Sequence, residues 1–262
     1  MGIINVTPDS FSGDGIHSNE SSAVRRGVEM FDAGAELVDI GGESTRPYAE
    51  EVSEEEELSR ILGVVSRLSS LHPGKISIDT MKPGVADAAL KAGATIVNDV
   101  SGLRSSDMRR IVAEHDASVI IMHMLGDPRT MQDSPEYDDV VREIVEFLSE
   151  RIAAAERDGI NPRQIMVDPG LGFGKTVEHN VDILRRLSEL KPLGKPIVVG
   201  ASRKSFIGRI TGGSVEKRLG GSIGAAVIAA ANGADIVRAH DVLETVQALQ
   251  VARRVLSNPD HA

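Results

Sequence analysis

Carboxylate and amide side chains stand at the ends of short apolar runs in this sequence. Asp79 and Asn98 each end such a run, and Asp168 ends a third one before a Pro-Gly pair. Carboxylates gathered in an apolar interior lose hydration unless they meet a cation or a ligand rich in N–H donors. A flat heterocycle with a guanidine-like edge would satisfy all three residues, so we expect one binding site. Each Asp alone could instead cap the helix that follows it.

Basic side chains collect behind the last two apolar runs, although the chain carries a formal charge of -10. Arg203 and Lys204 follow one run, and Arg238 and His240 end the other. An acidic protein needs such a local cluster to hold an anion, and guanidinium and ammonium groups bind phosphate well. The pattern therefore predicts a phosphate-bearing ligand. The alternative is that Arg203 or Arg238 pairs with an acid inside the protein.

The glycine-rich stretch Gly170–Thr176 ends in Gly-Lys-Thr, as a phosphate-binding P-loop does. A P-loop also needs a glycine five residues before Gly174, but Pro169 stands there. We therefore exclude a P-loop and expect a flexible loop that places Phe173 over a ligand. The alternative for Phe173 is a plug at the rim of the fold.

Metal-ligand patterns are weak. The seven histidines form no HExxH pair and the chain has no cysteine, so a tightly held transition metal is not expected. A Mg²⁺ that arrives with a diphosphate would need only one or two protein oxygens, such as those of Asn5 or Asp9. We interpret His123 as a histidine of the core.

Eight β-branched runs alternate with segments of helical apolar spacing, such as Val140, Ile144, Leu148 and Ile152. Their nearly continuous Ile and Val content is typical of strands covered on both faces. Eight such units in 262 residues predict a single-domain (β/α)8 TIM barrel over residues 1–262. An open doubly wound sheet is the alternative, but no GxGxxG turn is present. The expected strands are Gly2–Val6, Glu36–Ile40, Lys75–Asp79, Thr95–Asn98, Ser118–His123, Gln164–Asp168, Pro196–Gly200 and Asp235–Ala239.

The sequence also predicts where several helices begin and end. Gly34, Gly93 and Gly233 recur where a helix should end before a strand, and glycine tolerates the left-handed conformation of such ends. Ser53 with Glu56 three residues later predicts a capping box at a helix start.

Composition points to a cytoplasmic protein. The chain lacks an apolar window of the length of a membrane span and the pattern of a signal peptide, and the absence of cysteine fits a reducing compartment. The acidic charge disfavours nucleic acid and acidic membranes as partners.

Four segments of the chain resemble the motifs of the dihydropteroate synthase family. They begin at Gly2, Asp39, Asp168 and Gly200, and they read GIINVTPDSFS, DIGGESTRP, DPGLGFG and GASRKSF. The resemblance runs from Met1 to about Leu256. It implies a transferase of folate biosynthesis that joins 6-hydroxymethyl-7,8-dihydropterin diphosphate to p-aminobenzoate, with loss of pyrophosphate before attack by the amine. It also implies Mg²⁺, inhibition by sulfonamides and a homodimer formed through helices near the end of the chain.

The resemblance assigns roles by position. The pterin is expected to bind to Asp79, Asn98, Asp168 and Lys204. The diphosphate and Mg²⁺ are expected to contact Asn5, Arg238 and His240, with Asn5 as the metal ligand. p-Aminobenzoate is expected to lie among Phe11, Thr45, Arg46, Pro47, Phe173 and Ser205. The residues expected to act in catalysis are Asp9, Arg46, Lys204, Arg238 and His240.

Two other functions remain open at this point. A pterin-binding methyltransferase would share the barrel and its acidic pocket, but should lack the first and last motifs. A non-catalytic pterin-binding protein would result if small departures in the first loop, where Ser12-Gly13-Asp14-Gly15 stands, prevented closure.

Overall fold

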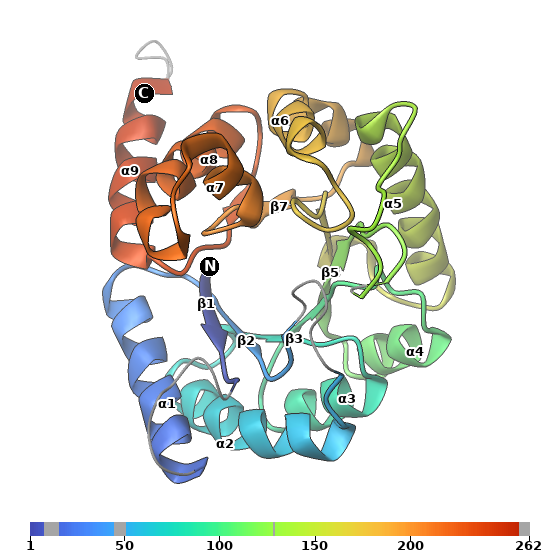
Figure 1. Ribbon diagram of the computed structural model, residues 1–262. Helices are drawn as coiled ribbons and strands as arrows, with labels where there is room; N and C mark the ends of the chain where they lie inside the picture. Colours follow the sequence, from blue (N-terminus) through green and yellow to red (C-terminus); the bar gives the residue numbers. More distant parts are fainter. Residues whose placement is uncertain (8–15, 45–50, 128, 257–262) are drawn as a thin grey trace.

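Eight parallel strands form a ring that is surrounded by helices in the computed structural model (Figure 1). The structure describes residues 1–7, 16–44, 51–127 and 129–256, without the side chains of residues 16–19. The strands are β1 (Gly2–Asn5), β2 (Val38–Gly41), β3 (Ile76–Asp79), β4 (Ile96–Asp99), β5 (Ser118–Met122), β6 (Ile165–Asp168), β7 (Val198–Val199) and β8 (Ile236–Val237).

Hydrogen bonds between neighbouring strands close the ring. Strands β1 to β6 pair in chain order, and β7 pairs with β8. Two single bridges join these sheets: Val167 faces Ile197, and Gly2 faces Ala239. The amide of Ala239 donates to the carbonyl of Met1 at 2.9 Å, which connects the last strand to the first. The predicted (β/α)8 barrel is confirmed, although β7 and β8 are shorter than expected.

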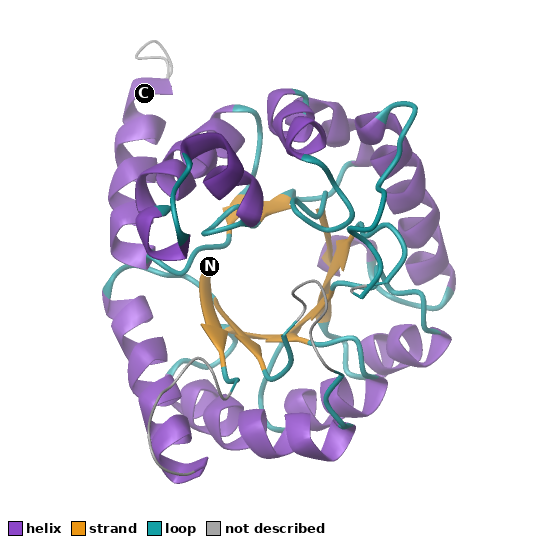
Figure 2. Ribbon diagram, viewed as in Figure 1, coloured by secondary structure: helices purple, strands orange, loops and turns teal. Residues whose placement is uncertain are grey.

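The helices form the outer layer of the barrel (Figure 2). They are α1 (Ile16–Asp32), α2 (Glu54–Leu71), α3 (Pro83–Lys91), α4 (Ser106–Glu114), α5 (Val140–Arg157), α6 (Val177–Arg185), α7 (Ser205–Thr211), α8 (Leu219–Ala231) and α9 (Val242–Leu256). Short 3₁₀ helices are η2 (Pro162–Gln164), η3 (Leu187–Leu193) and η4 (Val215–Lys217). Within the described ranges, no helix is both long and apolar enough to cross a membrane.

The predicted helix boundaries are present. The Ser53 side chain accepts a hydrogen bond from the Glu56 amide at 3.2 Å and caps α2. This is one half of the predicted capping box, whereas the Glu56 carboxylate pairs with Arg60. Gly34, Gly93 and Gly233 have φ angles of 97°, 109° and 107°, which residues with a Cβ atom rarely adopt. These glycines therefore serve the turns from helix to strand.

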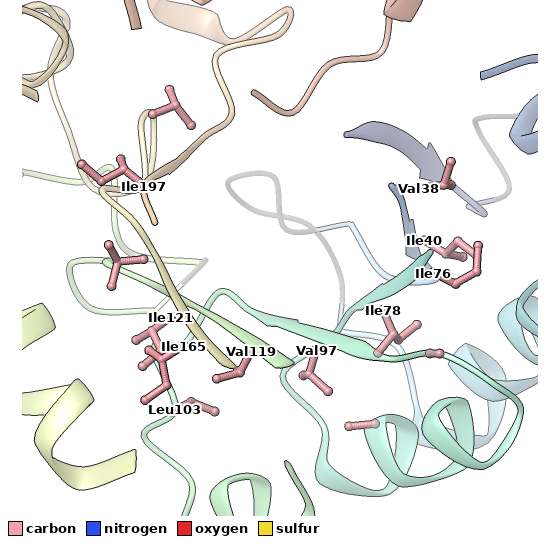
Figure 3. Packing of buried hydrophobic residues seen from close by; sticks show 14 of the residues in the cluster. Val38, Ile40, Ile76, Ile78, Val97, Leu103, Val119, Ile121, Ile165 and Ile197 are labelled. Carbon is pink, nitrogen blue, oxygen red and sulfur yellow. The ribbon is translucent and has the colours of Figure 1, made fainter. Parts of the chain in front are cut away.

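Side chains alternate between two environments along each strand. One set, including Ile76, Ile78 and Val97, packs against the helices in the main hydrophobic core (Figure 3). The other set points into the barrel, where Ile96, Ile120 and Val198 form a separate apolar cluster. This cluster fills the barrel below the strand ends, so polar side chains further along the same inward rows must form the floor of a site at the mouth.

Candidate active site

The floor of the barrel mouth consists of polar side chains at inward positions of the strands or just after the strand ends. Asn5, Asp79 and Asn98 are linked through consecutive strand registers: Asn5 pairs with Gly41, Gly41 with Asp79, and Asp79 with Asn98. Asp79 and Asn98, two of the three acceptors predicted from separate apolar runs, therefore lie in neighbouring positions at one mouth, because parallel strands end on the same side of the barrel.

Asp39 of β2 connects this group. Its side chain is fully buried, and its Oδ2 accepts from Asn98 Nδ2 at 3.0 Å and from the Arg238 guanidinium. The same guanidinium nitrogen lies 3.2 Å from Asp79 Oδ2. Sequence reasoning assigned Asp39 no role, although a carboxylate inside an otherwise apolar four-residue strand was a usable signal.

The network leaves hydrogen-bonding capacity unused. Among the described residues, Asp39 Oδ1, Asp79 Oδ1 and Arg238 Nε are buried without a hydrogen-bond partner. Burial, and next the charge of Asp39, raise the pKa of Asp79 to about 7, while Arg238 opposes the rise. Burial alone would disfavour the charge of Arg238, but Asp39, Asp79 and Asp168 together raise its pKa. The floor is therefore suited to a neutral or positively polarised ligand with N–H donors.

Asp168 is the last residue of β6 and is 3 % exposed. Its Oδ1 accepts from the amide of Gly170 at 2.7 Å, which fixes the turn after the strand. Burial raises its pKa, and the charge of Lys204 acts in the opposite direction. Asp168 does not cap the following helix, because Thr176 is the N-cap of α6. Its role as a ligand acceptor stays a prediction.

Lys204 and Phe173 meet at the edge of the floor. The Lys204 ammonium lies 4.4 Å from the centre of the Phe173 ring and donates to the carbonyl of Leu171. Burial lowers the pKa of Lys204 to about 8, while Asp168 counteracts the shift. Phe173 also packs against a methionine-rich cluster that contains Met122 and Met124. This apolar wall beside charged groups can bind one face of an aromatic heterocycle.

The segment from Gly170 to Gly174 differs from the flexible loop predicted from its glycines. Gly170, Gly172 and Gly174 have φ angles of 69°, 80° and 63°, so these glycines are required by a defined backbone path. The segment is rich in glycine because its backbone needs positive φ angles. Side-chain hydrogen bonds to the carbonyls of residues 171–174 hold it in place.

Asn5 and His240 lie together on the opposite side of the floor. Asn5 Nδ2 is 3.4 Å from His240 Nε2, and His240 Nδ1 is 3.0 Å from Ser202 Oγ. The described part of the chain contains no group of three or more His, Cys, Asp or Glu residues that could hold a metal ion. The described residues around Asn5 therefore offer a metal few further ligands.

The two arginines behave as the alternative interpretation predicted. The Arg203 side chain forms an ion pair with Asp241, with Nε and Oδ2 3.0 Å apart. Arg238 is paired with carboxylates of the floor, and its expected contact with a diphosphate stays a prediction. Ser205 is exposed at the first residue of α7.

His123 is a core histidine, as interpreted from the sequence. It is 5 % exposed, and burial lowers its pKa to about 2. The remaining predicted site residues, Asp9, Phe11, Thr45, Arg46 and Pro47, lie outside the described residues.

Comparison with known proteins gives a consistent result. The profile of the family described as pterin binding enzyme matches residues 1–240. The dihydropteroate synthase of Escherichia coli strain K12 is 47% identical over 257 residues, which cover 98% of this chain and 91% of that protein.

Solved structures are similar over the same length. A Xanthomonas albilineans dihydropteroate synthase with 4-aminobenzoic acid has a TM-score of 0.92 and 47% identity, covering 99% of this chain and 93% of that one. The Yersinia pestis enzyme in a sulfonamide complex has a TM-score of 0.93 and 44% identity, covering 98% of this chain and 94% of that one.

Proposed function

Because the chain belongs to the pterin-binding enzyme family, and within it to the dihydropteroate synthases, we propose that the floor described above binds the pterin diphosphate. The reaction joins 6-hydroxymethyl-7,8-dihydropterin diphosphate to p-aminobenzoate and yields 7,8-dihydropteroate and pyrophosphate. The observation that carries our placement is the pair of buried carboxylate oxygens, Asp39 Oδ1 and Asp79 Oδ1, that have no hydrogen-bond partner among the described residues.

The pterin-binding set comprises Asp79, Asn98, Asp168 and Lys204. A pterin offers an amino group and ring N–H groups as donors, which match the carboxylates, and a carbonyl and ring nitrogens as acceptors. Lys204 supplies the donor for these acceptors, because a pKa of about 8 leaves its ammonium mostly protonated at pH 7. Asn98 can both donate and accept, although its amide N–H₂ already donates to Asp39.

The same charges favour the reaction. The bond between the pterin methylene carbon and the diphosphate oxygen breaks, and its electron pair leaves with pyrophosphate. The resulting cation is delocalised into the pterin, next to the carboxylates of Asp39, Asp79 and Asp168, which stabilise positive charge. The amine of p-aminobenzoate then attacks the methylene carbon and loses a proton. Arg238 and His240 would stabilise the departing pyrophosphate.

The residues of the floor fit a Mg²⁺ that enters with the diphosphate. Asn5 offers an amide oxygen beside His240, and a magnesium ion bound mainly by phosphate oxygens and water needs few protein ligands. Bound there, Mg²⁺ would neutralise charge on the leaving group. Asp9 and Arg46 would organise the site and exclude water that could trap the cation.

p-Aminobenzoate would lie nearer the rim, among Phe11, Thr45, Pro47, Phe173 and Ser205. The similarity to the Yersinia pestis enzyme in its sulfonamide complex supports binding of sulfonamides in place of p-aminobenzoate. Inhibition should therefore be competitive with p-aminobenzoate. Turnover that is unaffected by a millimolar sulfonamide would contradict this assignment.

We further propose a homodimer and one domain over residues 1–262, working in the cytoplasm. An apolar surface on α8 and α9 supports the dimer: Ile228 is 50 % exposed and Val251 65 % exposed. Gly220 and Gly224 lie on α8, and a Cβ added at either would meet no atom of the described residues within 4 Å, which would let a second backbone approach closely. Sedimentation should give twice the mass of 27.9 kDa, and Ile228→Asp should shift it toward the monomer.

The test of the site is pyrophosphate release from the pterin diphosphate with Mg²⁺, with and without p-aminobenzoate. Asp168→Asn should lose turnover with little change of shape, whereas Asp107→Asn, at an exposed position of α4, should match the wild type. Full activity in Asp168→Asn would refute the placement. Pterin binding without turnover by the wild type would favour a non-catalytic pterin-binding protein.

A further inference from the structure

Four consecutive carbonyl groups after β6 each accept a hydrogen bond from a side chain, three of them from distant parts of the chain and one from Lys175 of the same loop. Leu171 O accepts from Lys204, and Gly172 O accepts from Gln132 Nε2 at 2.6 Å. Phe173 O accepts from Lys175 Nζ at 2.9 Å, and Gly174 O accepts from the Tyr137 hydroxyl at 2.8 Å. Each net bond of this kind contributes about 1 kcal/mol, and four in succession leave the segment little freedom.

Residues 171–173 surround the Lys204 side chain, and we call them the Lys204 sleeve. The Leu171 carbonyl binds the ammonium, and the Phe173 ring lies 4.4 Å from it. Between them, Gly172 leaves room for the alkyl chain, since a Cβ at that position would lie 3.1 Å from Lys204 Cδ. The position of Lys204 at the floor is therefore set by the path of residues 171–173.

Lys175 is the most buried of the four donors, at 3 % exposure. Besides Phe173 O, its amine lies 3.0 Å from His123 Nδ1. His123 is itself fixed, because its amide donates to Asp168 O at 2.9 Å and its ring packs edge-on against Phe147 of α5, with centroids 5.0 Å apart. Lys175 thus joins the sleeve to the end of β5 and to the outer helix layer.

We propose that Lys175 is a positioning residue for the reaction: it holds Phe173, and through it Lys204, in the geometry that receives the pterin. This inference rests on the proposed place of Lys204 in the pterin-binding set. It also gives a role to the Gly-Lys-Thr sequence, which a P-loop does not explain. The lysine donates to the backbone of its own loop, at the carbonyl of Phe173.

The charge state of Lys175 is compatible with this role. Burial, and next the charge of Lys204, hold the pKa of Lys175 well below its ordinary value. A neutral amine still donates to Phe173 O.

The test compares steady-state kinetics of Lys175→Met with those of the wild type. Methionine has a similar length but no donor. We expect kcat/KM for the pterin diphosphate to fall about tenfold to a hundredfold, because small misplacements of a binding group have effects of this size. The KM for the pterin diphosphate should rise. A mere loss of folded protein would lower kcat and leave both KM values unchanged.

A double-mutant cycle identifies the route of the effect. If Lys175 acts through Phe173, Lys175→Met should change kcat/KM less than about twofold in a Phe173→Leu background, since effects of residues in one network are not additive. The control Tyr137→Phe removes the neighbouring anchor on Gly174 O and should change kcat/KM by no more than about threefold in either background.

The outcomes separate this inference from the proposed site. Equal losses from Lys175→Met in both backgrounds would overturn the positioning role, and so would wild-type kinetics in Lys175→Met. In either case the proposed site still stands if Lys204→Met abolishes turnover. Wild-type kinetics in Lys204→Met would overturn the proposed site and this inference together. If Lys175→Met does not fold, Lys175→Leu removes the same donor with a shorter side chain and provides the same comparison.

Discussion

Replacing Asp79 by Asn should make the protein more stable at neutral and alkaline pH while it destroys the pterin site. The carboxyl group of Asp79 is largely buried, with 17% side-chain exposure, and its pKa rises from 3.8 to about 7 in the folded protein. The folded state therefore binds this proton more tightly than the unfolded state. Stability falls as the pH rises from about 4 to 7, and the loss is complete above pH 7.

The size of the loss follows from the two pKa values. At about 1.4 kcal/mol for each pH unit, ionising Asp79 costs the folded state at most about 4 kcal/mol above pH 7. An asparagine has no such cost, and its N–H₂ group can take the place of Oδ1, which has no hydrogen-bond partner among the described residues. Because water that enters the open mouth screens part of the charge, we expect Asp79→Asn to gain about 2 kcal/mol at pH 8.

Urea unfolding at several pH values between 4.5 and 8 would measure this effect. The free energy of unfolding of Asp79→Asn should exceed that of the wild type at pH 8, and the two should converge toward about pH 4. Asp139→Asn is a control of opposite sign, because ion pairing with Arg186 lowers the pKa of Asp139 to about 2. An Asp79→Asn variant that is less stable than the wild type at pH 8, or that keeps its pH dependence, would refute the reasoning.

Two further substitutions, at Lys82 and Gly170, test by urea unfolding how much single buried contacts contribute to stability. Lys82 bridges Glu43 at 2.6 Å and the fully buried Glu57 at 2.7 Å, so Lys82→Met should lose about 3–5 kcal/mol of stability. Lys91→Met, which removes an exposed ion pair, should lose less than about 1 kcal/mol, and equal losses would contradict the role of burial. Gly170→Ala should lose at least about 3 kcal/mol, because φ is 69° and the new Cβ would overlap the carbonyl of His123. Gly194→Ala, with a φ of 66° and open space, should lose only about 1–2 kcal/mol; a similar loss at both glycines would rule out the overlap.

The barrel could be predicted because each strand is nearly continuous in Ile and Val and each helix has its own apolar stripe. All eight strands overlap the expected runs, and their bounds differ by one to two residues at most ends. β7 and β8 have two residues each because ladder pairing is limited to Val198 with Ile236 and Val199 with Val237, with single bridges on either side. Such limits depend on the tilt of strands around the ring, which no local pattern encodes.

The floor of the site was predictable in part. Asp79, Asn98 and Asp168 could be found because each ends an apolar run, and parallel strands end at one mouth. The central position of Asp39 could not, because it depends on which inward row of β2 meets Arg238 from β8, 199 residues away. The role proposed for Lys175 was hidden for a similar reason: the partner of its amine, His123, comes from a different strand end.

The link between the first and last strands has a consequence for how this protein is made. Asn5 and His240 are 235 residues apart, yet they lie side by side at the floor. A ribosome would have to complete nearly the whole chain before the two could meet, so a partly synthesised chain would lack the Asn5–His240 side of the site. Contacts of such long range also form late and slowly during folding. Ligands bound across this seam stabilise the closed ring by an amount that grows with the logarithm of their concentration once it exceeds the Kd. Substrate supply would then influence how much of the newly made enzyme stays closed as well as how fast it works.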